Sequence, residues 1–208
     1  MIAGFTRHFW WGLALALVSL AIGTAAMAGI FKGADTSVFR ALAMTQATSA
    51  EPSIAAVEFI THLGDPGWRA GVMLVVLFAL IYRHCWRSAT VFLVTVGLSI
   101  TGHSAAKEAF ARPRPTLVPP LDHVDTYAYP SGHAAGAMVI LLLGAMLLGG
   151  RKTMIAAVLL AGAIGVSRVS LGVHWPSDVI GGWLFGGGAA LMGYAVARRV
   201  ARPKERLS

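Results

Sequence analysis

Long apolar runs bounded by charged residues are the dominant pattern of this 208-residue chain. Each run is close in length to the roughly 20 residues that an α-helix needs to cross a bilayer. A charge at the bilayer centre costs at least about 2.5–3.5 kcal/mol on insertion scales, so charges mark the ends of spans. The pattern predicts an all-α, polytopic membrane protein with six transmembrane helices in one bundle. They cover approximately Phe9–Ile30, Pro66–Cys85, Ser88–Ala106, Ser131–Gly150, Thr153–Leu171 and Ser177–Ala197.

The first two runs carry distinctive features at their ends. Arg7 precedes the first run, which ends near the A-x-A sequence at Ala26, as a signal peptide would. A signal h-region has only about 7–15 residues, so the greater length of this run predicts a retained helix. In the second run, Asp65 followed by Pro66 predicts an N-cap and a first-turn proline. Arg69 falls in the same first turn, where a long side chain can reach the interface.

Two connections on the same side of the predicted bundle are long. The first, residues 31–64, contains apolar residues at helical spacing over 52–63, which predicts a short helix at the membrane interface or packed over the bundle. The second, Lys107–Pro130, is rich in proline and cannot be one continuous helix. Glycines gather inside the runs, where we expect them to allow close helix contact. The densest group is Gly181, Gly182, Gly186, Gly187 and Gly188.

Composition agrees with a membrane protein. Hydrophobic residues make up 56% of the chain and charged residues 12%, against about 25% charged in ordinary soluble domains. This balance excludes an ordinary soluble globule. Cys85 is the one cysteine, so an internal disulfide framework and a multi-cysteine metal site are excluded as well. The length suits one membrane-embedded domain over residues 1–208.

The net charge of +8 is unevenly divided between the two sides of the predicted bundle. One side has ten basic residues and a single acid, whereas the other has seven basic residues and eight acids. The positive-inside rule makes the first side cytoplasmic, with both termini there. The excess is therefore a topology signal, and we expect no nucleic-acid partner. The ten basic residues are Arg7, Arg83, Arg87, Arg151, Lys152, Arg198, Arg199, Arg202, Lys204 and Arg206.

Three polar motifs lie at the outer ends of the third to sixth runs. They are K-x6-R-P over Lys107–Pro115, P-S-G-H over Pro130–His133 and S-R-x5-H-x3-D over Ser167–Asp178. In this order and on one side, they resemble the type-2 phosphatidic acid phosphatase superfamily. The resemblance extends to the whole chain, because bacterial membrane members have six spans with these motifs in the second and third outer loops. It implies a lipid phosphatase with a phosphohistidine intermediate at His174, assisted by His133.

The residues themselves also predict an anion site. Two helices begin near Ser131 and Ser177, so their unsatisfied N–H groups and positive dipole ends point to the outer face. Two others end in Lys107 and Arg168, and Arg114 follows on the proline-rich connection. Three cations and a helix terminus can disperse the charge of a phosphoryl group during transfer. We therefore expect these three basic side chains to bind phosphate.

His174 is the best candidate for a nucleophile. A neutral imidazole can attack phosphorus in line, and Asp178 can reach its other nitrogen if a helix begins at Trp175 and Pro176. That carboxylate would fix the tautomer and stabilise the cation that forms. His133 is then expected to protonate the leaving group and afterwards to activate water.

The remaining polar residues have smaller expected roles. The backbone N–H groups of Ser131 and Gly132 should complete the phosphate site, and the hydroxyl of Ser167 is expected to bind phosphate or a neighbour. His103 is expected to be satisfied within its own helix. Arg112 is expected to meet lipid headgroups, the alternative being a second phosphate. Loop solvation is favoured over metal binding for Asp122, His123 and Asp125.

The expected activity is hydrolysis of a phosphate monoester or pyrophosphate on a membrane lipid at the outer face of a bacterial-type plasma membrane. No acidic motif spaced for magnesium is present, so neither a metal nor another cofactor is expected. Undecaprenyl pyrophosphate is the preferred substrate; phosphatidylglycerophosphate, phosphatidic acid and lipid A phosphates are alternatives. Phosphotransfer to another lipid or sugar also stays open. A lipid transporter would not explain the two histidines, and six spans argue against a soluble haloperoxidase of the same superfamily.

Overall fold

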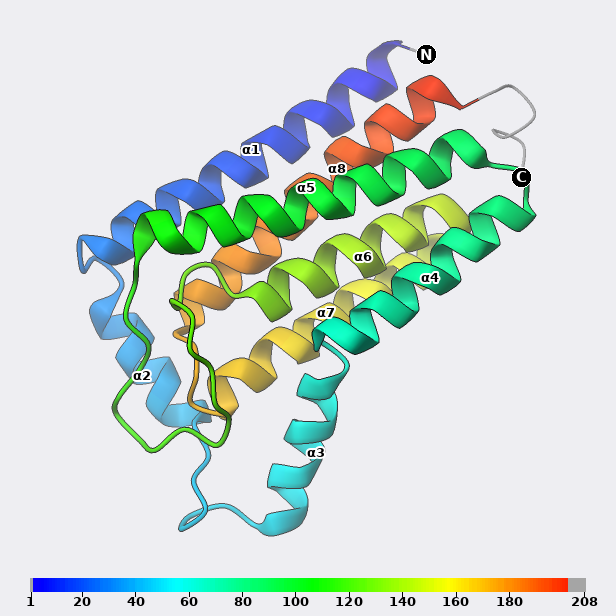
Figure 1. The fold of residues 1–208 in the computed structure, drawn as a ribbon. Helices are drawn as coiled ribbons and strands as arrows, with labels where there is room; N and C mark the ends of the chain where they lie inside the picture. Colours follow the sequence, from blue (N-terminus) through cyan, green and yellow to red (C-terminus); the bar gives the residue numbers. More distant parts are fainter. Residues whose placement is uncertain (1, 202–208) are drawn as a thin grey trace.

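The computed structural model describes residues 2–201, and the regular elements in that part of the chain are eight α-helices (Figure 1). The prediction of an all-α protein is confirmed. The helices are α1 (Ile2–Met27), α2 (Lys32–Leu42), α3 (Glu51–His62), α4 (Pro66–Tyr82), α5 (Trp86–Phe110), α6 (Gly132–Leu148), α7 (Arg151–Ser170) and α8 (Pro176–Val200).

The six apolar runs correspond to α1 and to α4 through α8, and the ends differ by up to seven residues, the largest difference being at the start of α1. The short helix expected over 52–63 corresponds to α3. The helix α2 was not predicted, because its sequence is polar as well as apolar and buries only Asp35 and Phe39. Its amphipathic face covers the end of the bundle, where it packs against α7 and α8.

Four helices, α1, α5, α7 and α8, are long and apolar enough to cross a membrane, and α3 with α4 passes the same test as one segment bent by 49°. The helix α6 has 17 residues, about 26 Å at 1.5 Å per residue, which is short of the about 30 Å hydrocarbon core. Because α6 packs against α4, α5, α7 and α8, its length is matched to its neighbours more than to lipid. The described residues thus give four or five candidate spans of a multi-pass membrane protein.

The long helices lie side by side in one bundle (Figure 1). At one end of it lie α2, α3 and the irregular connection between α5 and α6. The beginning of α1 and the end of α8 lie at the opposite end. Four charged residues counted in the topology argument, Arg202, Lys204, Glu205 and Arg206, lie outside the described residues.

Close contact between α6 and α8 depends on glycine, as expected. A Cβ atom on Gly186 would lie 2.3 Å from the carbonyl oxygen of Ala135, and one on Gly182 would lie 2.6 Å from that of Ser131. The two backbones are therefore in direct contact. At the start of both helices, the N–H of Ser131 donates to the carbonyl of Asp178 at 3.0 Å, so that two of the motifs are joined by this packing.

Alanine substitutions at two glycines of α8 should distinguish the effect of helix packing on stability from the effect of helix propensity. Gly186→Ala is expected to lower the free energy of unfolding by about 1–3 kcal/mol, because α8 must move away from α6. Gly187→Ala is the matched control, since its Cβ would make an ordinary 3.8 Å contact with Met138 Cγ. Both variants gain the same helix propensity. Thermal unfolding in detergent, followed by tryptophan fluorescence, measures the difference, and equal midpoints would contradict the packing argument.

Candidate active site

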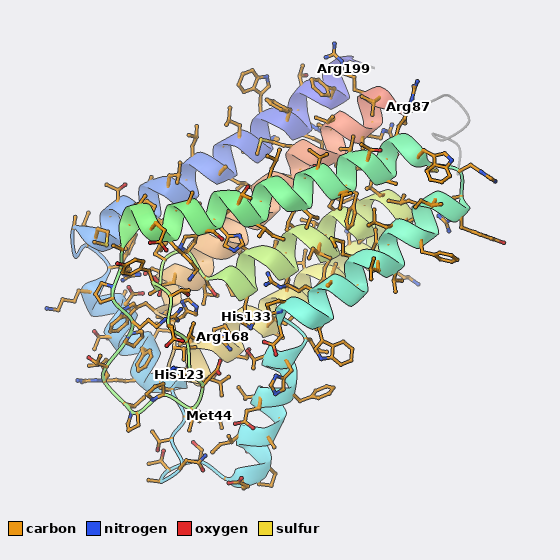
Figure 2. The ribbon with its side chains drawn as sticks, in the orientation of Figure 1. Met44, Arg87, His123, His133, Arg168 and Arg199 are labelled. Atoms are coloured by element: carbon orange, nitrogen blue, oxygen red, sulfur yellow. The ribbon has the colours of Figure 1, made fainter. Side chains whose placement is uncertain are left out.

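The three motifs meet at the end of the bundle that carries α2, α3 and the connection from residue 111 to 131. Here α5 and α7 end, while α6 and α8 begin. Figure 2 shows His133 and Arg168 at this end, beside the connection that carries His123, whereas Arg87 and Arg199 lie at the opposite end. The chain direction of the helices therefore brings together residues that are far apart in sequence.

Lys107 and Arg114 are held by the same two residues of the connection. The ammonium group of Lys107, in the last turn of α5, donates to the carbonyl oxygen of Tyr127 and, at 3.4 Å, to the hydroxyl of Thr126. The guanidinium of Arg114 donates to the carbonyl of Thr126 at 2.7 Å and to that of Tyr127 at 3.2 Å. The irregular backbone of the connection thus positions both cations together.

Arg168 is the most deeply buried of the three cations, with 1% of its surface exposed. Its Nη1 donates to Thr61 Oγ1 at 2.7 Å, and its Nη2 pairs with Asp122 Oδ2 at 2.7 Å. The expectation that Asp122 is only solvated is wrong, because a buried guanidinium needs a counter-charge and this carboxylate supplies it. His123 and Asp125 are almost fully exposed and pair with each other at 2.8 Å, as solvated loop residues do.

His174 is 2% exposed and faces this cluster from the turn between α7 and α8. Its Nε2 lies 3.3 Å from Arg114 Nη1, and its Nδ1 lies 3.4 Å from Asp178 Oδ2. A guanidinium can only donate, so Nε2 carries the lone pair and Nδ1 the proton of the neutral ring. The nitrogen that is able to attack an electrophile therefore points toward the cations.

Burial and charge both keep this imidazole neutral. Burial lowers the pKa of His174 well below its ordinary value of 6.5, and the positive charges of Arg114, Lys107 and Arg168 lower it further. Burial, followed by the charge of Arg168, lowers the pKa of Arg114 to about 10, which leaves its guanidinium protonated at neutral pH. A neutral nucleophile beside full positive charges suits an anionic electrophile.

The start of α8 fixes the other side of His174. Trp175 is the N-cap residue and Pro176 the first helical residue, as predicted, which puts Asp178 in the first turn. Its Oδ2 accepts the N–H of Trp175 at 2.8 Å. The carboxylate is thus held by its own helix, with the ring of His174 3.4 Å from the same oxygen.

Arg112 is buried between two carboxylates. Its Nη1 donates to Asp178 Oδ1 and, at 2.8 Å, to Ser177 Oγ, while its Nη2 pairs with Asp35 Oδ2 at 2.8 Å. Only 7% of the residue is exposed. The expectation that Arg112 meets lipid headgroups is wrong, and so is the alternative of a second phosphate, because its side chain is committed to buried acids.

Two groups expected to bind phosphate are engaged elsewhere. The N–H of Ser131 donates to the carbonyl of Asp178 at 3.0 Å, and the hydroxyl of Ser167 donates to the carbonyl of Ile164 at 2.7 Å. Both donors thus have acceptors within the protein, and for Ser167 the acceptor is a neighbour, which was one of its two expected partners. The buried hydroxyl of Ser131 has no partner among the described residues, and Gly132 is the first residue of α6.

His133, the second residue of α6, is bound by an acid from outside the motifs. Its Nε2 donates to Asp65 Oδ1 at 2.9 Å, and His62 Nδ1 donates to the other oxygen of the same carboxylate at 2.8 Å. Asp65 does stand at the N-cap position of α4, but its side chain makes no capping bond there. Instead of capping α4, the carboxylate of Asp65 accepts hydrogen bonds from two histidines.

Sequence reasoning missed the residues that support the motifs from the first half of the chain. They are Asp35, Thr61, Asp65 and Arg69. Their one signal was a charge or hydroxyl beside apolar residues, as with Arg69 at the start of α4, and it did not reveal a partner. The prediction for His103 is confirmed, since its Nδ1 is paired with the carbonyl of Ser99, 2.8 Å away in α5.

Comparison with known proteins gives a family and a fold. The profile of the PAP2 superfamily matches residues 88–202. The chain is 32% identical over 137 residues to phosphatidylglycerophosphatase B of Bacillus subtilis, covering 61% of this chain and 66% of that protein. It is 33% identical over 121 residues to undecaprenyl-diphosphatase of Sulfolobus acidocaldarius, covering 54% and 56%. The chain thus spans less than two thirds of the length of these two relatives.

A solved structure shares the fold over nearly the whole chain. It is the crystal structure of a transmembrane PAP2 type phosphatidylglycerolphosphate phosphatase from Bacillus subtilis, which superposes with a TM-score of 0.83. The match covers 93% of this chain and 99% of that one at 24% identity. The bundle, including the part before residue 88, is therefore a fold that a membrane protein is known to adopt.

Proposed function

Because this chain belongs to the PAP2 superfamily, we propose that it is a membrane lipid phosphatase that works through a phosphohistidine at His174. One observation carries the proposal. The lone pair of a buried, neutral His174 faces Arg114, while Asp178 lies 3.4 Å from the opposite nitrogen. The relatives named as phosphatases support the same chemistry.

In the first step, Nε2 of His174 attacks phosphorus and the bond from phosphorus to the leaving oxygen breaks. The non-bridging oxygens are bound by Lys107, Arg114 and Arg168, which disperse the charge of the transition state. To do so, Arg114 turns from Nε2 to phosphate, and phosphate replaces the carboxylate of Asp122 on Arg168. The ring of His174 becomes cationic on forming the P–N bond, and Asp178 stabilises that charge.

In the second step, water replaces histidine. His133 donates a proton to the leaving oxygen during the first step, which leaves its imidazole neutral. It then accepts a proton from water, whose oxygen attacks phosphorus and breaks the P–N bond. Phosphate is released, and both histidines return to their initial protonation states. These residues need no metal ion for either step.

The proposed topology has six spans, both termini in the cytoplasm and the active site on the outer side of the plasma membrane, within a single domain over residues 1–208. The distribution of charge along the sequence supports it, because the side expected to lie away from the site carries ten basic residues and a single acid. Arg87 and Arg199 are two of them (Figure 2).

The preferred substrate is undecaprenyl pyrophosphate, which would be converted to undecaprenyl phosphate. The name of the Sulfolobus acidocaldarius relative supports it, whereas the possible contact of Arg112 with a second phosphate no longer does. Phosphatidylglycerophosphate is the second candidate, favoured by the Bacillus subtilis relative and by the shared fold.

A panel of lipids in detergent tests the function and the substrate together. Undecaprenyl pyrophosphate, phosphatidylglycerophosphate, phosphatidic acid and lipid A are presented at equal surface concentration, and phosphate release is measured. We expect undecaprenyl pyrophosphate to have the highest kcat/KM by about tenfold, which corresponds to about 1.4 kcal/mol of transition-state stabilisation. Equal rates on all four lipids would contradict the preference. Release from none of them by folded protein would contradict the function.

A further inference from the structure

The elbow between α3 and α4, defined as residues 61–69, closes the site with a part of the chain that carries none of the three motifs. It contacts Arg168 near the end of α7 and two residues at the start of α6. Thr61 accepts from Arg168 at 2.7 Å, Asp65 accepts from His133 at 2.9 Å, and Arg69 donates to the carbonyl of Gly132 at 3.0 Å. The elbow also lies before residue 88, where the match to the family profile begins.

The ring of His133 rests on the backbone of this elbow. A Cβ atom on Gly64 would lie 2.7 Å from His133 Cδ2 and 2.5 Å from Ile164 Cγ2, so only glycine leaves room for the imidazole. The elbow bends the path of the chain by 49° between α3 and α4, which turns Gly64 and Asp65 toward α6 and α7. The backbone therefore limits the position of the ring, and Asp65 selects which edge faces it.

The hydrogen bond decides which nitrogen of His133 holds its proton. An ionised carboxylate can only accept, so Nε2 carries a proton and Nδ1 is the nitrogen left to exchange protons with substrate and water. The carboxylate of Asp65 attracts the imidazolium, the form that a general acid requires, and so offsets part of the effect of burial and of the charges of Arg168 and Arg69, which favour the neutral ring. When Nδ1 has lost its proton, Nε2–H is still held, and the lone pair on Nδ1 is ready to accept from water.

The carboxylate is itself held from the side of the solvent. His62 donates to its second oxygen at 2.8 Å, and 62% of the His62 side chain is exposed, against 39% for Asp65 and 19% for His133. The three groups form a row from solvent to the site. Asp65 thus bridges an exposed histidine and the histidine beside the phosphate site.

We propose that Asp65 is the positioning residue of His133, which sets the tautomer of its imidazole and stabilises its protonated form. This role rests on the proposed phosphatase function and adds to it a residue from outside the motifs. It differs from a structural role in one measurable way. In the steps up to departure of the leaving group, a residue that prepares a general acid matters only for leaving groups that need a proton.

The test compares two leaving groups in the Asp65→Asn variant. One substrate is dioctanoyl phosphatidic acid, whose alkoxide must be protonated as it leaves, and the other is 4-nitrophenyl phosphate, whose phenolate leaves without a proton. The constant kcat/KM reports the steps up to departure of that group. We expect a loss of about 10- to 100-fold on phosphatidic acid and of less than about threefold on the nitrophenyl ester.

Three further variants serve as controls. Glu58→Gln removes the same charge from α3, and Glu58 makes no hydrogen bond or ion pair within residues 2–201, so both rates should stay unchanged. Asp65→Glu keeps a carboxylate and should recover part of the loss. His62→Asn should cost less than about threefold, because His133 keeps its direct partner.

The outcomes separate the inference from the proposed function. An equal loss on both substrates in Asp65→Asn, or no loss on phosphatidic acid, would overturn the role of Asp65 while leaving the phosphatase in place. A wild-type protein that is folded but releases phosphate from neither substrate would overturn the proposed function. Thermal unfolding of each variant identifies a loss of activity that is due to misfolding.

Discussion

Replacing His174 by glutamine is expected to lower phosphate release by at least about 10⁴-fold, because the variant loses the atom that bonds to phosphorus. Glutamine keeps a polar side chain of similar size in the buried position, so the fold should persist. The remaining activity would come from Lys107, Arg114 and Arg168, which still bind phosphate and stabilise the transition state for direct attack by water.

Trapping of the phosphoenzyme gives this prediction a second measurement. Wild-type protein quenched during turnover of a ³²P-labelled lipid should retain label that is stable to base and labile to acid, as a P–N bond is. The His174→Gln variant should retain none. His123→Gln is the control, because His123 is an exposed loop residue whose loss should leave turnover unchanged. Labelled His174→Gln protein, or turnover near the wild-type rate, would contradict a phosphohistidine at this position.

The sequence predicted the helices and the meeting of the motifs for a simple physical reason. Long apolar runs must be antiparallel neighbours in a small bundle, so every second helix end lies at the same end of it. Lys107 and Arg168 lie in the last turns of two helices, and Gly132 and Pro176 begin two others. Their approach follows from chain direction alone.

Partners of individual polar groups could not be predicted in this way. Arg112 and Asp35 are 77 residues apart, and nothing in their spacing indicates an ion pair. The hydroxyl of Ser167 donates to the carbonyl of Ile164 in its own helix, and the sequence alone does not distinguish this acceptor from phosphate. Such choices depend on distances of a few ångströms, which the pattern of apolar residues does not define.

The span lengths show the same limit. The fourth apolar run continues to Gly150, but α6 ends at Leu148, and Gly149 and Gly150 are extended. An apolar run shows which residues can lie in lipid or in a protein core. It does not show where the helix ends, because that depends on where the backbone turns. A central helix such as α6 is surrounded by protein, so its sequence is apolar without its length having to match the bilayer.

Arg112→Met is the variant with the largest expected effect on stability. Arg112 is the partner of two buried carboxylates, those of Asp35 and Asp178. Removal of one partner of a buried ion pair typically costs about 3–5 kcal/mol, because the remaining charge is left without compensation. Methionine fills much of the same volume, so the loss should reflect charge more than packing. Thermal unfolding in detergent, with intact protein confirmed by size-exclusion chromatography, measures it.

A second substitution distinguishes this network from a lipid contact. In the Arg112→Met background, Asp35→Asn removes one of the two uncompensated charges and should recover part of the lost stability. In wild-type protein the same change removes a good ion pair and should lower stability. Such a change of sign is the signature of coupled residues. If Arg112 instead bound headgroups, Arg112→Met would raise KM for anionic lipids without altering thermal unfolding, and the effects of the two substitutions would add. Recovery by Asp35→Asn therefore requires that Arg112 is coupled to the buried carboxylate of Asp35 and not to lipid headgroups.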